Sequence, residues 1–410
     1  MKTMFSFLLT FVFVFSVATF AQEGEKNVRY GGYARLFSMG DNPYVVDPDN
    51  IKLNSAYTSI YSNFLWGDIG GDNGNPTDGY GQFFGFNYAV SKELTLGAIL
   101  SRNDYMSSYS ISSLDPYNLV NLVNNAGATY NVLPLNNNLE VLGSYRFGTS
   151  VLGLGVSYAS TSNEFNPAVG SDGSASASQF GVNLGFLGKA SREVEFDVAV
   201  SLSMPSATYE PNDSVTFDAS QMIISANARA QIELSKKFSL VPTIDFFTAS
   251  GSIDVDNESS DLRSHMGFGF GLGLQYKVEN LIIAGGPALR YDSYTDAAID
   301  TTYPELSGSS FTLPAWNFGA EWMFNDWLIG RIGYVASNYS SSYEVAASNT
   351  TVDEYSSTSF YEGDFRLGVG FRFGGFNLDA TVNDDVLRHG FNLVGGGVRT
   401  FAYLSASFGF

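Results

Sequence analysis

The segment "FAYLSASFGF" (401–410) alternates two kinds of residue along its whole length. Successive side chains of an extended chain point to opposite faces, so every second residue shares a face. One face is apolar and carries Ala402, Leu404, Ala406, Phe408 and Phe410. The other face is mixed and contains smaller residues. This alternation predicts a β-strand with two unlike faces that ends on an aromatic residue.

The same period of two recurs through the chain from about residue 80. In "EVEFDVAVSLSM" (193–204), one face is entirely apolar and the other carries acidic and small side chains. The stretches "ELTLGAILS" (93–101) and "QMIISANARAQIEL" (221–234) alternate in the same way. Repeated stretches of about ten alternating residues predict an all-β fold.

The connections between these stretches alternate in length. Short connections occupy 91–93, 148–150, 189–193, 235–237, 278–280, 325–326 and 374–375. Long connections, rich in Ser, Asn, Asp, Tyr and Gly, occupy 105–137, 161–176, 205–219, 250–263, 293–309 and 341–358. This rhythm is typical of a transmembrane β-barrel, with tight turns at one end and long loops at the other. A β-sandwich normally has shorter strands and no such rhythm.

Aromatic residues cluster near the ends of the alternating stretches, which supports the barrel. They include Tyr158, Tyr276, Trp322, Phe324, Trp327 and Phe373. Aromatic rings favour the two membrane–water interfaces of such barrels. We therefore predict a closed antiparallel barrel in the outer membrane of a Gram-negative cell.

Sixteen segments fit the strand pattern, and the first and the fifteenth fit it least well. They are 58–68, 79–90, 94–104, 138–147, 150–160, 177–188, 193–204, 219–234, 237–249, 264–277, 280–292, 310–324, 327–340, 359–374, 376–384 and 397–410. If both ends of the barrel meet on the same side of the membrane, the number of strands must be even. The sequence alone therefore leaves fourteen and sixteen strands open.

Residues 1–21 have the pattern of a signal peptide. Lys2 precedes a short apolar core, and the small-residue ending at Ala21 predicts cleavage before Gln22. We divide the remainder into an N-terminal segment at 22–57 and a barrel at 58–410. Residues 22–57 combine turn signals with short apolar pieces such as Tyr44-Val45-Val46, which predicts a folded plug inside the barrel rather than a disordered leader.

The composition narrows the range of functions. The chain has 410 residues, no cysteine and two histidines. Thiol chemistry is therefore excluded, and only two histidines are available for a metal site or as general bases. Its formal net charge of -20 argues against nucleic-acid binding through a basic patch. No nucleophile is accompanied by a base in a recognisable motif, and we expect neither an enzyme nor a bound cofactor or metal.

The stretch "ARLFSMGDNPYVVDPDNIKLNSA" (34–56) resembles the opening of FadL-like outer-membrane transport proteins and their secretion-associated relatives. Arg35, Met39 and Gly40 match the first half of that opening, and Asn54 and Ala56 match the second. The resemblance implies a barrel of fourteen strands, which we take as the expected number, with sixteen as the alternative. It also implies that the N-terminal segment is a hatch in the lumen and that hydrophobic molecules are taken up.

Charged residues fall on the less apolar faces of several expected strands. They are Glu195, Asp197, Arg229, Glu233, Asp245, Glu321, Arg331, Arg366, Arg372 and Asp379. Their signs are mixed, which favours ion pairs packed around the hatch over an eyelet that selects solutes by charge. The acidic run at 252–261 lacks the glycine and the spacing of a twelve-residue calcium loop.

We expect passive uptake of small hydrophobic or amphipathic solutes. A general aqueous porin is one alternative, and an outer-membrane anchor, shuttle or adhesin is another. The expected partners are outer-membrane lipid, a hydrophobic small molecule and, during biogenesis, the barrel-assembly machinery, which we expect to recognise a terminal strand such as 401–410. No nucleic-acid partner is expected.

Overall fold

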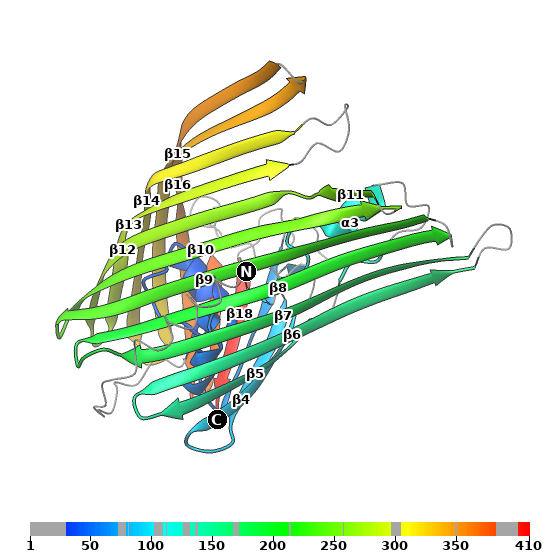
Figure 1. Cartoon of the computed structure of the whole chain (residues 1–410). Coiled ribbons are helices and arrows are strands. Elements are labelled where there is room, and N and C mark those ends of the chain that lie inside the picture. The colour runs from blue at the N-terminus through cyan, green and yellow to red at the C-terminus, as the bar shows by residue number, and fades with distance from the viewer. Residues whose placement is uncertain are drawn as a thin grey trace, which may run out of the picture.

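A computed structural model of the protein shows one antiparallel sheet that closes on itself as a barrel (Figure 1). The structure describes residues 30–72, 79–80, 82–101, 110–111, 113–125, 132–135, 138–166, 172–212, 215–256, 258–296, 305–348, 351–382 and 401–410. The signal-peptide prediction for 1–21 lies outside these residues. Among them, no helix is both long and apolar enough to cross a membrane.

Sixteen strands form the wall in the described part of the chain, so the expectation of fourteen was wrong and the alternative of sixteen is confirmed. They are β1 (Phe64–Asp72), β3 (Phe83–Ala89), β4 (Leu94–Ser101), β5 (Asn138–Phe147), β6 (Ser150–Phe165), β7 (Gly173–Lys189), β8 (Val194–Asn212), β9 (Val215–Ser235), β10 (Phe238–Val255), β12 (Ser264–Val278), β13 (Leu281–Asp296), β14 (Leu306–Asn325), β15 (Leu328–Ser348), β16 (Thr351–Phe373), β17 (Phe376–Val382) and β18 (Phe401–Gly409). Two short strands, β2 (Gly79–Tyr80) and β11 (Glu258–Asp261), pair with β1 and β10. The wall has sixteen rather than fourteen strands because the two segments that fit the pattern least well, the first and the fifteenth, both pair with their neighbours as β1 and β17.

Strand β18 closes the barrel. It pairs with β17 on one side and with β1 on the other, where Phe408 lies opposite Leu65. The amide of Phe410 donates to the carbonyl of Asn63 at 3.0 Å, which fixes the end of the strand. Its even-numbered residues point outward and Tyr403, Ser405 and Ser407 point inward, as the alternation predicted.

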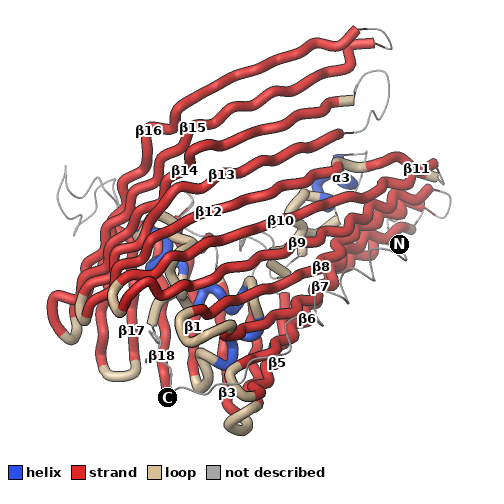
Figure 2. Tube along the Cα trace, turned by 60° about the vertical axis from the view of Figure 1, so that its left-hand side comes forward, coloured by secondary structure: helices blue, strands red, loops and turns tan. Residues whose placement is uncertain are grey.

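The wall is tall from β6 to β16 and low elsewhere (Figures 1 and 2). Most residues of 205–219 and 341–358, which we predicted as loops, instead continue β8, β9, β15 and β16. The prediction failed because these extensions are polar on the outside. Backbone hydrogen bonds can continue a ladder whatever the side chains are, but an apolar alternation no longer marks it.

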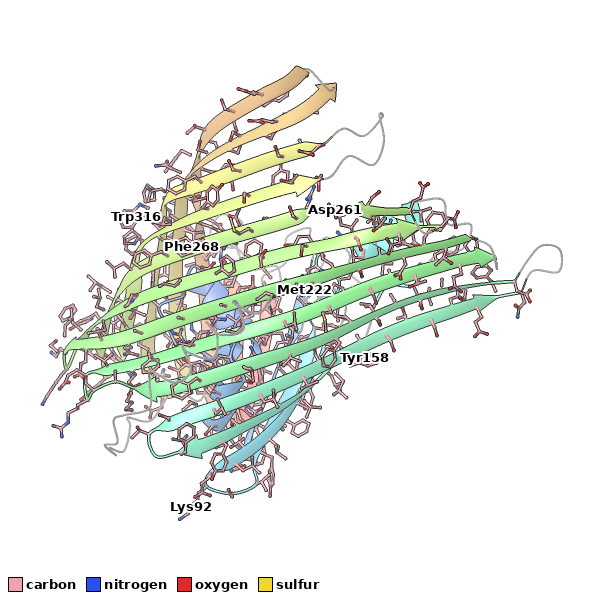
Figure 3. The ribbon with its side chains drawn as sticks, in the orientation of Figure 1. Lys92, Tyr158, Met222, Asp261, Phe268 and Trp316 are labelled. Atoms are coloured by element: carbon pink, nitrogen blue, oxygen red, sulfur yellow. The ribbon has the colours of Figure 1, made fainter. Side chains whose placement is uncertain are left out.

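The outward face changes composition at one level of the wall. On β8 it is apolar from Val194 to Met204 and then carries Ser206, Thr208 and Glu210. Figure 3 shows Tyr158, Met222, Phe268 and Trp316 on the outer surface, between Lys92 at the lower turns and Asp261 at the upper end. These four side chains are 57%, 46%, 42% and 37% exposed, respectively. The exposed apolar surface is therefore a continuous belt rather than scattered residues.

The pairing register breaks at one level across four neighbouring strands. Shifts lie between Ala288 and Arg290 in the β13–β14 pair, between Thr312 and Ala315 in the β14–β15 pair, and between Val335 and Ser337 in the β15–β16 pair. Pro314 lies at this level, where its missing N–H removes a ladder hydrogen bond. Pro242 and Pro287 also lie inside strands, but in regular register with Leu272 and Trp316.

In the part of the chain that the structure describes, four short helices lie inside the barrel. They are α2 (Tyr33–Ser38), η1 (Pro48–Lys52), η2 (Ser55–Ser59) and α3 (Leu119–Asn125). The first three belong to residues 30–63, here named the enclosed segment, which precedes β1 and makes buried contacts with strands all around the wall. The barrel ladder begins at Phe64 rather than at the expected residue 58, because η2 occupies 55–59.

Inward-facing glycines make room for the enclosed segment. A Cβ added at Gly153 would lie 2.1 Å from the backbone nitrogen of Ala56. We predict that Gly153→Val prevents η2 from seating against β6 and makes the enclosed segment sensitive to protease in the folded barrel. The matched control is Gly143→Val, because the nearest atom to a Cβ at this position on the neighbouring strand is 3.6 Å away. Equal protease resistance of the two variants would contradict this packing.

Candidate functional site

The enclosed segment is tied to the wall by a buried network of charges around Arg35 in α2. The Nε and Nη2 atoms of Arg35 donate to Glu321 on β14 at 2.8 and 3.1 Å. Its Nη1 donates to Asp47, in the same segment, at 3.0 Å. Both Arg35 and Asp47 are 0% exposed. Arg35, one of the motif residues of 34–56, therefore supplies the cation that attaches the segment to the wall.

The network continues along the wall. The Nε of Arg331 on β15 donates to Glu321 at 2.6 Å, and its Nη2 lies 2.7 Å from Asp379 on β17. Arg372 on β16 reaches the same Asp379 oxygen at 2.9 Å. Three guanidinium groups thus face three carboxylates, and we name this set the central network: Arg35, Asp47, Glu321, Arg331, Arg372 and Asp379. Buried charges avoid a large desolvation cost only when they are paired in this way.

A second anchor is built around Arg229 on β9. Its Nε donates to Asp197 on β8 at 3.0 Å, and its Nη2 donates to the hydroxyl of Tyr57 at 2.7 Å. Its Nη1 donates to the carbonyls of Pro43 and Val45 at 3.2 and 3.1 Å. One side chain from the wall therefore satisfies acceptors at two distant places in the enclosed segment.

A third anchor joins the segment to the opposite side of the wall. Arg366 on β16 pairs with Asp41 and with Asp364, the latter at 2.8 Å. Its guanidinium lies 3.9 Å from the ring centroid of Phe37, a cation–π arrangement. The segment is thus held on both sides of the lumen.

The remaining motif residues make close backbone contacts. Met39 is fully buried, and a Cβ at Gly319 would lie 2.7 Å from its Cβ. Gly40 has φ +81°, and its carbonyl accepts from Asn317 at 2.7 Å. A left-handed backbone of this kind favours glycine. The motif therefore turns the chain where it touches β14.

Asn54 caps η2 and joins it to the wall. Its Oδ1 accepts from the amide of Ala56 at 3.1 Å, and its Nδ2 donates to the carbonyl of Val198 at 3.2 Å. Ala56 is fully buried, and its backbone nitrogen would lie 2.1 Å from a Cβ at Gly153 and 2.9 Å from a Cβ at Gly185. All five predicted motif residues therefore lie at contacts between the segment and the wall.

Four predicted lumen charges lie outside the central network and the anchor around Arg229. One of them, Glu233, is exposed near the lower end of β9, so the structure does not bring it to the enclosed segment. Asp245 pairs with Arg290 at 3.4 Å, higher in the barrel. Arg366 forms the third anchor. Glu195 is 54% exposed near a turn and pairs with Lys189, so the structure does not bring it to the segment.

Sequence reasoning missed several residues that hold the segment. The Nδ2 of Asn42 donates to the carbonyl of Ala284 at 2.8 Å, and the hydroxyl of Tyr44 donates to the carbonyl of Pro287 at 3.1 Å. Tyr44 packs over Gly271 and Gly273 of the glycine-rich strand β12. The apolar run 44–46 signalled burial, but only the folded chain shows that its aromatic ring fits the side-chain-free positions of β12.

A second inner feature lies above the enclosed segment. Helix α3 packs on the inner face of the tall wall, where small residues such as Ala177 and Ala207 make room for Leu119 and Val123. Within the acidic run 252–261, Ser252–Val255 of β10 pair with Glu258–Asp261 of β11, and the described residues contain no cluster of three or more potential metal ligands.

The protein is similar in architecture to solved outer-membrane transporters. The Pseudomonas putida toluene transporter TodX is 12% identical with a TM-score of 0.39, and the match covers 96% of this chain and 100% of TodX. The FrpB iron transporter from Neisseria meningitidis (F5-1 variant) is 10% identical with a TM-score of 0.40, and the match covers 80% of this chain and 63% of FrpB. The copper transporter OprC is 11% identical with a TM-score of 0.38, covering 85% of this chain and 80% of OprC.

The chain thus spans less than two thirds of the length of FrpB. No protein-family model matches the sequence, and no curated protein matches it. At identities of 10–12%, the similarities concern architecture and not substrate.

We predict that Glu321→Gln lowers the free energy of unfolding by about 3–5 kcal/mol, because it leaves Arg35 and Arg331 buried with a neutral partner. Glu195→Gln is the matched control and should cost about 0–1 kcal/mol, since that pair is exposed. The measurement is urea-induced unfolding of the barrel in detergent micelles. Equal effects of the two substitutions would show that the central network does not stabilise the fold.

Asp47 predicts a pH dependence of stability. Burial raises the pKa of Asp47 from 3.8 to about 6, although Arg35 acts in the opposite direction. Between about pH 4 and 6 the folded barrel therefore binds a proton that the unfolded chain releases. The contribution of Asp47 to the free energy of unfolding falls as the pH rises through this window, by up to about 3 kcal/mol. Asp47→Asn should remove this slope, and an unchanged slope in the variant would exclude Asp47 as its source.

Proposed function

We propose that this protein is an outer-membrane barrel that admits small hydrophobic or amphipathic solutes by passive diffusion, with the enclosed segment as a hatch. The apolar belt supports the membrane location. From Val194 to Met204 the strand rises by about 33 Å, which at a typical tilt of about 40° gives a height of about 25 Å, as transmembrane barrels require. The polar extensions of β6–β16 then project beyond the outer leaflet. On β18, the alternating face ending in Phe408 and Phe410 suits recognition by the barrel-assembly machinery.

The hatch proposal rests on one observation: the enclosed segment is attached to opposite sides of the lumen. Arg229 holds it at β8 and β9, and Arg366 holds it at β16, while the central network holds it between them. An open aqueous porin has no need to bury three ion-paired guanidinium groups against such a segment. The arrangement therefore favours a blocked lumen over a water-filled channel.

The register breaks in β13–β16 suit a sideways exit for hydrophobic solutes. They lie in consecutive strands, at a level where the ladder loses hydrogen bonds. A solute that leaves through the wall at this level enters lipid without passing the hatch. This route favours an apolar or amphipathic solute, because the exit opens on the apolar belt.

The hatch is tested by conductance in planar bilayers. We predict that removal of residues 22–57 from the mature chain raises the conductance from a low basal level to that of an open pore. Unchanged conductance after the deletion would refute the hatch.

The sideways exit is tested by uptake of oleate and of toluene into cells that lack their own transporters. Deletion of Pro314 removes the additional residue of β14 and should restore regular pairing with β13 and β15. We predict that this variant loses uptake but still becomes conductive when 22–57 are also deleted. Uptake at the level of the unaltered protein would exclude this exit. If neither probe enters through the unaltered protein, the anchor, shuttle or adhesin alternative is favoured.

A further inference from the structure

The inner face of the tall wall has two unlike halves. On β6–β10 it is apolar and is covered by α3, which packs against small residues such as Ala159 and Ala219. On β13–β16 the inner face carries tyrosines, hydroxyls and charged groups instead. Tyr339, Tyr343 and Tyr355 are 40%, 40% and 48% exposed, respectively. This second half offers polar aromatic surface rather than a packed core.

The side chains of this second half form rows, because the four strands are in register above the breaks. The tyrosine row consists of Tyr294, Tyr343 and Tyr355, with Gly308 between the first two. A Cβ at Gly308 would lie 2.6 Å from the ring of Tyr294, so this ring leans across the glycine toward Tyr343. Tyr343 and Tyr355 are stacked, with ring centroids 4.7 Å apart and an interplanar angle of 13°. At about 4.8 Å between strands, the row extends for about 15 Å.

The hydroxyl row lies directly beneath the tyrosine row. It consists of Asp292, Ser310, Ser341 and Ser357, one from each strand. The hydroxyls of Ser341 and Ser357 are 2.9 Å apart, and Arg290 donates to Asp292 at 2.9 and 3.1 Å. The next row down carries Arg290 itself and three more side chains with hydroxyl groups: Thr312, Tyr339 and Ser359. Aromatic ring faces therefore stand beside ordered hydrogen-bonding groups.

We infer that the tyrosine and hydroxyl rows bind a neutral saccharide. A sugar ring has an apolar C–H face, which stacks on an aromatic ring, and a rim of hydroxyls, which need hydrogen-bond partners. An apolar ligand would cover these serine and carboxylate groups without replacing their bonds to water, at a cost of about 1–3 kcal/mol for each group left unsatisfied. Polyanions are disfavoured by Asp292 and Asp296 and by the net charge of -20.

This site does not depend on the proposed transport. It lies above the register breaks and the enclosed segment, and binding there needs neither an open lumen nor a lateral exit. Failure of the uptake experiments would leave the site intact. Loss of saccharide binding would equally leave the hatch and the exit unaffected.

The test is isothermal titration calorimetry of the mature chain with cellohexaose and maltohexaose. The barrel is held in lauryldimethylamine oxide, whose head group contains no sugar and cannot compete. We expect at least one of these saccharides to bind, and Tyr343→Ala and Tyr355→Ala each to weaken binding by about tenfold, as expected for the loss of one stacked ring. Ser342→Ala is the matched control, because it lies next to Tyr343 on the outward face and should bind as the unaltered protein does.

Circular dichroism and heat-modified gel mobility establish that each variant is folded. Absence of binding by either saccharide up to its solubility limit would overturn the inference. Unchanged affinity of both folded tyrosine variants would do the same, because it would place binding elsewhere. Binding of toluene that is lost in Tyr343→Ala, without any saccharide binding, would show that the surface takes apolar aromatics instead.

Discussion

Closure of the sheet by β18 is the constraint on which the rest of the structure depends. A strand edge carries unpaired backbone N–H and C=O groups, and lipid offers them no partner. Pairing β18 with both β17 and β1 removes that edge over the height of the apolar belt. In the membrane location that we propose, the outward face of the closed wall must suit lipid, and its polar side chains are confined to the interior or to the extensions.

The closed wall in turn dictates how the interior is filled. Inward-facing arginines and carboxylates cannot reach bulk water easily, so they need partners inside the barrel. The enclosed segment supplies several of these partners, with Arg35 for Glu321 and Asp41 for Arg366. The segment and the wall therefore depend on one another, because separating them removes one of the two ionic partners of Glu321 and one of the two of Arg366. Glycines such as Gly153 and Gly333 allow the two backbones to approach closely enough for these contacts.

Much of the fold could be predicted because the period of two is a local property of the chain. The alternation in 193–204 and 401–410 identified strands whose outward residues are those that were expected. The upper halves of β8, β9, β15 and β16 escaped prediction, since Ser206, Thr208 and their equivalents alternate between polar and small residues. Their strand conformation is imposed by backbone pairing with a neighbour, which no local hydrophobic pattern reveals.

The motif residues were predicted from a resemblance, but their roles were not. Arg35, Met39, Gly40, Asn54 and Ala56 all lie where the segment meets the wall, and only the folded chain identifies Glu321, Asn317 and Val198 as the partners. Likewise, the tyrosines of β13, β15 and β16 are far apart in sequence and become one row through strand register.

The sequence by itself determined that the chain forms an all-β barrel with an apolar outer face, because side-chain alternation follows from the geometry of an extended chain. It also excluded thiol chemistry, because the chain has no cysteine, and its net charge of -20 argued against nucleic-acid binding through a basic patch. Only the tertiary structure decided the number of strands, the pairing of the inner charges and the level of the register breaks. These depend on which residues face one another across strands, and that is set by the register of the whole closed sheet.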